Sequence, residues 1–162
     1  MKGKVHLFGD HVDTDQIIPG AYTKTLDVDA LASHAFEYLD PDFRSRMKSG
    51  DFVVAGEDFG CGSSREQAPL ALKASGVAAV VASSFARIFY RNAINIGLPV
   101  VEIGPHEIKN GSELEIDLEG GRLVDRTAER SYQAAKIPAV MMDILREGGL
   151  VAYLKKHGDY QL

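Results

Sequence analysis

The sequence contains one cysteine, no long apolar run and no excess of basic residues, and each shortage excludes a class of protein. The single thiol, Cys61, rules out an internal disulfide and fits a reducing compartment. It also rules out an iron–sulfur cluster held by this chain alone, because such a cluster usually takes about four thiolates. No stretch reaches the roughly 18 apolar residues of a membrane span, and residues 1–8 lack the pattern of a signal peptide. We therefore expect a cytoplasmic protein with no membrane partner.

The charge balance argues against a nucleic-acid partner. The formal net charge is −5 and the acidic and basic residues are interspersed, whereas a nucleic-acid-binding protein needs a basic stripe to neutralise phosphates. Hydrophobic residues make up 45% of the 162 residues, which is typical of globular proteins. A chain of this length can form a core that is stable without disulfides or bound metal ions. We predict one domain over residues 1–162.

The middle of the chain alternates between short apolar strands and helices. Strands are predicted over residues 52–55, 77–82 and 99–103, and helices over residues 64–75 and 84–95. A strand–helix–strand–helix–strand order is typical of a parallel sheet with right-handed crossovers. The fold class is therefore α/β. Pro69 is unfavourable inside a helix, so we expect an irregular first turn there.

The flanking segments complete the prediction. They comprise a strand over 4–8, a loop over 9–20, a helix capped by Asp27 that stops before Pro41, a hairpin of 113–118 with 122–124, and one or two helices over 138–156 interrupted at residues 148–149.

The glycine-rich turn over residues 60–66 lies between a predicted strand and a predicted helix, where open α/β sheets bind ligands and helix starts attract anions. Ser63 and Glu66 have the spacing of a capping box, which is a structural explanation for both. Arg65 favours a binding role, because a cation at a helix N-terminus costs ~0.3–1 kcal/mol unless it pairs with an anion such as a bound carboxylate. Glu66 is the alternative partner for this charge. Glycines at 60 and 62 let the backbone approach such a ligand. Neither a dinucleotide fingerprint nor a P-loop is present.

Other polar residues give weaker signals. Asp10, Asp13 and Asp15 stand close together but lack the glycine and distal glutamate of a calcium loop, so one would orient a catalytic group while the others cap turns. Cys61 has no sequence partner that marks a catalytic thiol. The histidines have no zinc-like spacing, and the pair Arg87 and Arg91 is typical of a helix surface.

Several motifs, in the same order along nearly the whole chain, resemble the small subunit of 3-isopropylmalate dehydratase in the aconitase superfamily. They are residues 9–19 (GDHVDTDQIIP), 56–67 (GEDFGCGSSREQ), 84–92 (SFARIFYRN), 95–99 (NIGLP) and 146–150 (REGGL). The resemblance implies a swivelling β/β/α domain equivalent to the fourth domain of aconitase. It also implies a large subunit that carries a [4Fe–4S] cluster, and an active site formed between the two chains.

By match to the aconitase motif, Ser63 would be the base that removes a proton from the carbon next to a carboxylate. Arg65 would bind a substrate carboxylate, Ser64 and Gly62 would lie beside it, and Asp15 would belong to the same site. A helix N-terminus supplies at most ~2 kcal/mol, or roughly 1.5 pKa units, which is too little to ionise a serine. We therefore predict that the isolated chain is catalytically silent, because more N–H donors and exclusion of water by the partner are needed.

The substrate is less closely defined than the reaction. The resemblance assigns specificity to the loop over residues 21–25 (AYTKT), where Lys24 would suit a third carboxylate and an apolar pocket would suit an isopropyl group. Lys24 as a solvated surface residue is the structural alternative. Homoaconitase or another malate-type dehydratase is the alternative within this class. A stand-alone organic-anion-binding module that uses the 60–65 turn is the alternative from another class.

Overall fold

A computed structural model describes residues 1–160 and contains one seven-stranded sheet in the order β4-β3-β2-β1-β5-β6-β7. The strands are β1 (Lys2–Leu7), β2 (Phe52–Ala55), β3 (Ala79–Ala82), β4 (Val100–Glu102), β5 (Glu113–Asp117), β6 (Arg122–Asp125) and β7 (Arg130–Gln133). Neighbouring strands from β1 to β4 are parallel, whereas β5 joins β1 in antiparallel register and continues into β6 and β7.

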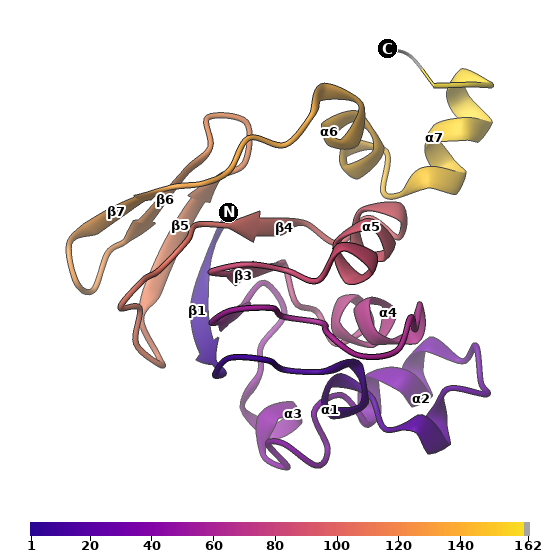
Figure 1. Cartoon of the computed structure of the whole chain (residues 1–162), viewed down its shortest axis with the longest axis horizontal. Coiled ribbons are helices and arrows are strands. Elements are labelled where there is room, and N and C mark those ends of the chain that lie inside the picture. Colours follow the sequence, from indigo (N-terminus) through magenta and orange to yellow (C-terminus); the bar gives the residue numbers. More distant parts are fainter. Residues whose placement is uncertain (161–162) are drawn as a thin grey trace.

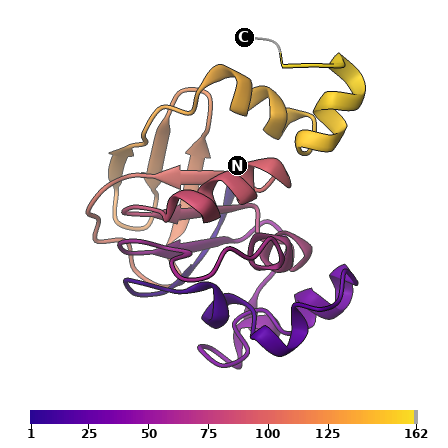
Figure 2. The same ribbon diagram turned by 45° about the vertical axis from the view of Figure 1, so that its right-hand side comes forward.

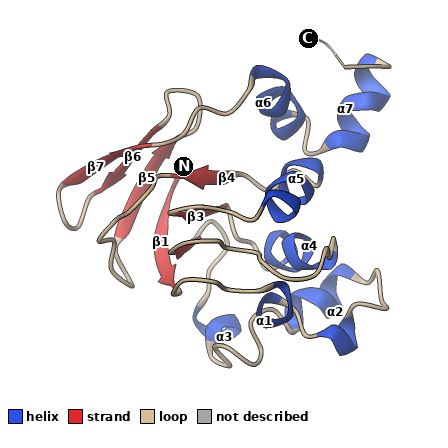
Figure 3. Cartoon of the chain, viewed as in Figure 1, coloured by secondary structure: helices blue, strands red, loops and turns tan. Residues whose placement is uncertain are grey.

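The helices gather on one side of the parallel strands, and the antiparallel strands lie on the other (Figures 1 and 3). The helices are α1 (Thr14–Ile17), the 3-10 helix η1 (Gly20–Tyr22), α2 (Val28–Ser33), α3 (Phe43–Arg46), α4 (Gln67–Ala74), α5 (Arg87–Asn95), α6 (Ala139–Arg146) and α7 (Leu150–His157). The result is a β/β/α arrangement in which β2-α4-β3-α5-β4 forms the predicted alternating core. The α/β prediction is confirmed.

Two apolar clusters, one on each face of the parallel strands, explain why β2 and β3 are apolar at every position. Phe52 and Val54 face the antiparallel strands and pack with Leu114, whereas Val53 and Ala55 face the helices. Both strands are fully buried, which is the environment that selects continuous apolar runs.

The predicted helix over residues 28–39 is shorter in the structure. Asp27 caps it as expected, with Oδ1 accepting from the backbone N–H of Asp29, but α2 ends at Ser33. Phe36 takes a left-handed conformation (φ 56°) and donates its N–H to the carbonyl of Ile17. Its buried ring stacks on Phe8 at 4.1 Å, so tertiary packing overrides the helical period here.

The helix after the glycine-rich turn starts later than predicted. α4 begins at Gln67 rather than at about residue 64, so Pro69 falls in the first turn, where its missing N–H costs little. The capping box predicted for Ser63 and Glu66 is wrong. Glu66 is itself the N-cap residue, and no side chain caps α4.

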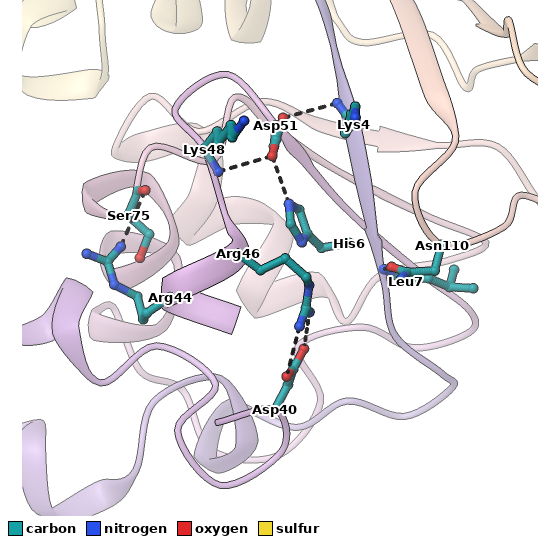
Figure 4. Close-up of polar contacts among 10 residues, drawn as sticks. All are labelled: Lys4, His6, Leu7, Asp40, Arg44, Arg46, Lys48, Asp51, Ser75 and Asn110. Carbon is teal, nitrogen blue, oxygen red and sulfur yellow. Dashed lines mark hydrogen bonds and ion pairs between the residues drawn. The ribbon is translucent and has the colours of Figure 1, made fainter. Parts of the chain in front are cut away.

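At the edge where β1 and β2 begin, a buried carboxylate ties these strands together (Figure 4). Asp51 accepts hydrogen bonds from the backbone N–H groups of Lys4 and Lys48, each at 3.1 Å. His6 Nε2 lies 2.8 Å from Asp51 Oδ2, and the ring of Phe43 in α3 covers His6. This network adds side-chain links between β1 and the residue before β2 to the backbone pairing of the two strands.

Candidate active site

The loop after β1 and the turn after β2 run side by side and are hydrogen-bonded along their length. The bonds are Gly56 N–H to Gly9 O (3.1 Å), Glu57 N–H to Asp10 Oδ1 (2.8 Å), His11 N–H to Glu57 O (2.7 Å), Gly60 N–H to Val12 O (2.7 Å) and Thr14 N–H to Cys61 O (2.9 Å). Because β1 and β2 are parallel, both segments leave the sheet at the carboxyl ends of strands. The two sequence motifs therefore form one site at the edge where α/β sheets bind ligands.

Asp15 and Arg65, predicted for one site, form an ion pair with 2.9 Å between Asp15 Oδ1 and Arg65 Nη2. Asp15 is in the first turn of α1, where the helix dipole favours an acid, and its side chain is 59% exposed. Arg65 is 23% exposed, and no other acceptor within residues 1–160 contacts its guanidinium. The remaining N–H donors of Arg65 are therefore free to bind a carboxylate in the bidentate manner.

Gly20 lies against this guanidinium. A β-carbon at Gly20 would be 2.9 Å from Arg65 Nη1, so a larger residue would crowd the arginine. The start of η1 thus forms one wall beside the ion pair.

Ser63 is held through its backbone. The hydroxyl of Thr14, which is 2% exposed, donates to the Ser63 carbonyl at 2.9 Å. Ser63 and Ser64 are themselves exposed, and the hydroxyl of Ser63 has no hydrogen bond to Glu66. Gly62, directly before them, is exposed and has φ 91°. The arrangement fixes the position of Ser63 and leaves its hydroxyl open to a reactant.

A cluster of buried and partly buried aromatic rings packs against the glycine-rich turn over residues 60–66. Phe59 packs edge-on against Phe89 of α5 with the ring centroids 5.1 Å apart, and Phe85 extends the contact. Gly60 has φ 83°, and a β-carbon there would lie 2.2 Å from the Phe89 ring. Only glycine fits this position, so the motif's glycine has a packing reason.

The predicted specificity loop is anchored next to the site. The side-chain amide of Gln67, at the start of α4, donates to the carbonyl of Thr23 at 2.9 Å. Lys24 follows, is exposed, and has no ion-pair partner within the described residues. Its ammonium is thus available to a ligand, and its role stays a prediction.

The other residues considered as candidates, Asp10, Asp13 and Cys61, have contacts or properties that argue against a catalytic role. Asp13 is the N-cap of α1 in a capping box with Gln16, which matches the turn-capping alternative for this acid. Asp10 instead accepts a hydrogen bond from the backbone N–H of Glu57, 47 residues away in the neighbouring turn. Burial, with the nearby carboxylates of Asp58 and Asp13, raises the pKa of the Cys61 thiol. A raised pKa keeps the thiol protonated and argues against a nucleophilic role.

Sequence inspection did not find Thr14, Gln67 or Gly20, which position the candidate residues. Thr14 stands beside Asp15, and its burial next to an exposed acid is visible only once α1 is placed. The polar groups of this edge do not include a metal site: within residues 1–160 no group of three or more His, Cys, Asp or Glu residues is arranged to hold a metal ion. Two cavities of about 670 and 460 Å³ are lined by other residues, around Arg130 and around Lys48.

The parallel sheet with antiparallel strands on one side, and the Ser63–Arg65 turn at its carboxyl edge, define a domain of the aconitase type. The chain belongs to the aconitase C-terminal domain family, whose model matches residues 3–105. This confirms the family predicted from the motifs.

The relatives are more specific. The chain is 53% identical to 3-isopropylmalate dehydratase small subunit 2 of Archaeoglobus fulgidus, covering 100% of this chain and 99% of that protein. It is 52% identical to the methanogen homoaconitase small subunit of Methanothermobacter thermautotrophicus, covering 96% and 91% of the two chains. The crystal structure of 3-isopropylmalate dehydratase from Methanocaldococcus jannaschii superposes with a TM-score of 0.93 at 50% identity, covering 97% of this chain and 94% of that one. Within residues 1–160, no helix is both long and apolar enough to span a bilayer.

Proposed function

We propose that this chain is the small subunit of a cytoplasmic heteromeric hydro-lyase that interconverts 2-isopropylmalate and 3-isopropylmalate by dehydration and rehydration, in leucine biosynthesis. The observation that carries the proposal is the pairing of Asp15 with Arg65 beside a backbone-anchored Ser63, in a chain of this family. The full-length relatives named 3-isopropylmalate dehydratase small subunit support the same substrate.

In this proposal Arg65 binds a substrate carboxylate with the donors that Asp15 leaves free, and Asp15 sets the orientation of the guanidinium. Ser63 then takes the proton from the carbon next to that carboxylate. Since α4 begins at Gln67, Ser63 lies outside its first turn, and the helix dipole contributes less than the ~2 kcal/mol allowed above. The stabilisation of an alkoxide must come mainly from nearby N–H donors, from Arg65, and from exclusion of water.

The partner is a large subunit, which the relatives' designation as small subunits implies. The chain has one cysteine, and within residues 1–160 no residues are grouped to hold a metal. We therefore place the expected [4Fe–4S] cluster on the large subunit, where it would act as a Lewis acid on the departing hydroxyl. Ser63, Ser64 and Asp15 are exposed in this chain, which agrees with a site that the partner completes.

The test is a hydration assay with 2-isopropylmaleate, using this chain and the cluster-bearing large subunit from the same source under anaerobic conditions. We expect activity that requires both chains and falls by at least about 10³-fold in Ser63→Ala, with the cluster absorbance unchanged. Ser64→Ala is the matched control next in sequence and is expected to lose less. Turnover by the small subunit alone, or full activity of Ser63→Ala, would contradict the proposed mechanism.

Homoaconitate is the second candidate substrate, favoured by the homoaconitase relative and by the unpaired Lys24 near the site. Lys24→Ala is expected to reduce kcat/KM for homoaconitate about tenfold more than for 2-isopropylmaleate, because only the former has a third carboxylate for the ammonium to meet. Equal losses for the two substrates would remove Lys24 from the specificity determinants. A mixture inactive on both, with an intact cluster and tight binding of malates by this chain alone, would favour the anion-binding module instead.

A further inference from the structure

Large exposed apolar side chains are concentrated in one short segment of the chain. Leu26 is 80% exposed and Tyr38 71%, and Val28 and Leu39 are also exposed. We call these residues the α2 patch, because they flank that helix. Val28 and Leu39 belong to the apolar helical face expected to pack into the core, yet the helix ends at Ser33 and leaves them outside. Side chains of this size in contact with solvent mark an interaction surface when they are grouped.

The α2 patch is continuous with the candidate active site. Tyr22, the last residue of η1, stacks its ring at 3.5 Å on the ring of His34, the C-cap residue of α2. The first residue of the same 3-10 helix, Gly20, lies against the guanidinium of Arg65. α2 also packs directly on α4, the helix that follows the Ser63–Arg65 turn. The helix that carries the α2 patch is thus connected to the site residues through η1 on one side and through α4 on the other.

We propose that the α2 patch is the docking surface for the large subunit. This inference rests on the proposed function, which requires a second chain over Ser63 and Arg65. The exposed acids Asp27 and Asp29 stand between Leu26 and the rest of α2, so the complementary face of the large subunit has an apolar centre with basic residues at its edge.

A second exposed apolar group provides a contrast. Val151 in α7 is 67% exposed, and Tyr160 follows the same helix. α7 and α2 lie at opposite ends of the molecule in both ribbon views (Figures 1 and 2), and α7 packs against α5 and α6, whereas α2 packs against α4. Val28 and Val151 are both exposed valines in the first turn of a short helix, so they form a matched pair of substitution sites.

The experiment measures the affinity of the small subunit for the cluster-bearing large subunit by isothermal titration calorimetry, and kcat for 2-isopropylmaleate hydration with the large subunit in excess. The variants are Leu26→Ser, Tyr38→Ser and Val28→Ser, with Val151→Ser as the control. We expect Leu26→Ser and Tyr38→Ser to raise Kd about tenfold or more, and Val28→Ser less, since buried apolar anchors dominate interface energetics. Val151→Ser should leave Kd unchanged, and kcat of the saturated complex should stay near that of the wild type throughout.

The outcomes separate this inference from the proposed function. Unchanged affinity in all patch variants, or a larger loss in Val151→Ser than in Leu26→Ser, overturns the docking surface while the hydro-lyase assignment stands. A wild-type complex that forms but hydrates none of the candidate acids defeats the proposed function, and the Kd series still tests the surface. Absence of any wild-type complex overturns both. The substituted side chains are exposed, so the circular dichroism and Tm of the free variants serve as a check that the fold is retained.

Discussion

Two paired acids, Asp51 and Asp15, lie beyond opposite ends of strands β1 and β2, and the two pairs differ in burial and in hydrogen bonding. At the edge where the strands begin, Asp51 is 8% exposed, and both of its carboxylate oxygens accept hydrogen bonds. At the edge where they end, the Asp15 side chain is 59% exposed and holds Arg65 through one contact. The Asp51 carboxylate is buried and bonded at both oxygens, whereas Arg65 of the second pair retains unused donors on a partly exposed side chain.

The difference distinguishes Asp51, which stabilises the fold, from Asp15, which belongs to the candidate site. Burial raises the pKa of the Asp51 carboxyl, but the hydrogen bonds from His6 and from the backbone of Lys48 and Lys4 outweigh it and lower the pKa overall. Because Asp51 is ionised, Nε2 of His6 carries the shared proton, and the buried Nδ1 is left without a hydrogen bond among the described residues. A buried carboxylate with both oxygens hydrogen-bonded stabilises a fold, while an exposed ion pair with unused donors is available to a ligand.

The strongest test of the contrast is removal of each carboxylate in turn. Asp51→Ala is expected to lower the free energy of unfolding by about 3 kcal/mol, because it leaves His6 and two backbone N–H groups without their acceptor. Asp15→Ala should cost at most about 1 kcal/mol, since the pair it breaks is exposed. Urea unfolding followed by circular dichroism measures both. Equal losses in the two variants would contradict the distinction.

The Asp51 effect should also depend on pH in one direction. Its folded pKa lies below the unfolded value of about 3.9. The stability it contributes is therefore complete above that unfolded value and is lost as the pH falls through the lower folded pKa. The advantage of wild type over Asp51→Asn should shrink as unfolding is measured from pH 6 down to pH 3. An advantage that grows on acidification would show that another group titrates.

The second test examines the unused donors of Arg65. Arg65→Lys keeps the charge and the attraction to Asp15 but loses the planar fork. We expect a loss in kcat/KM of roughly 30-fold, equivalent to about 2 kcal/mol, with the free energy of unfolding within about 0.5 kcal/mol of wild type. Steady-state kinetics of the two-chain enzyme, at a large-subunit concentration that saturates the variant, provides the measurement. Full activity in the lysine variant would mean that the site needs only a positive charge.

Part of this architecture follows directly from the sequence. β2 and β3 are buried on both faces, so their apolar runs needed no partner information to be recognised. The predicted helix ends at residues 75 and 95 are each followed, within two residues, by a positive-φ glycine, Gly76 and Gly97, which is a common way for a helix to end. Asp15 and Arg65 were assigned to one site through the motif resemblance, and the structure places them 2.9 Å apart. Their roles in catalysis remain predictions.

Other features depend on contacts that no local pattern contains. The spacing of Ser63 and Glu66 predicted a cap, but the backbone carbonyl of Ser63 is taken by Thr14, 49 residues away, and the helix starts after both. β7 and the one-turn helices α1 and α3 were missed, because segments this short have weak periodicity and are stabilised by packing. The helical pattern that continues to Leu39 was misleading because Phe36 turns into the core, an arrangement set by Phe8 and Ile17.

Thr14 shares a feature with each of the two pairs. It is buried like Asp51, and it contacts the candidate site like Asp15. Its hydroxyl donates to the Ser63 carbonyl, so we interpret it as a positioning residue. Thr14→Val keeps the shape and removes the donor. We expect kcat to fall by about tenfold with KM little changed, and the free energy of unfolding to fall by about 1 kcal/mol.

Thr14→Ser retains the hydroxyl and should recover most of the lost kcat, although it removes a buried methyl group and therefore costs stability as well. Loss of stability in both variants with wild-type kcat in each would assign Thr14 to the fold alone. Recovery of kcat by serine without recovery of stability can arise only if the hydrogen bond to Ser63 serves the reaction.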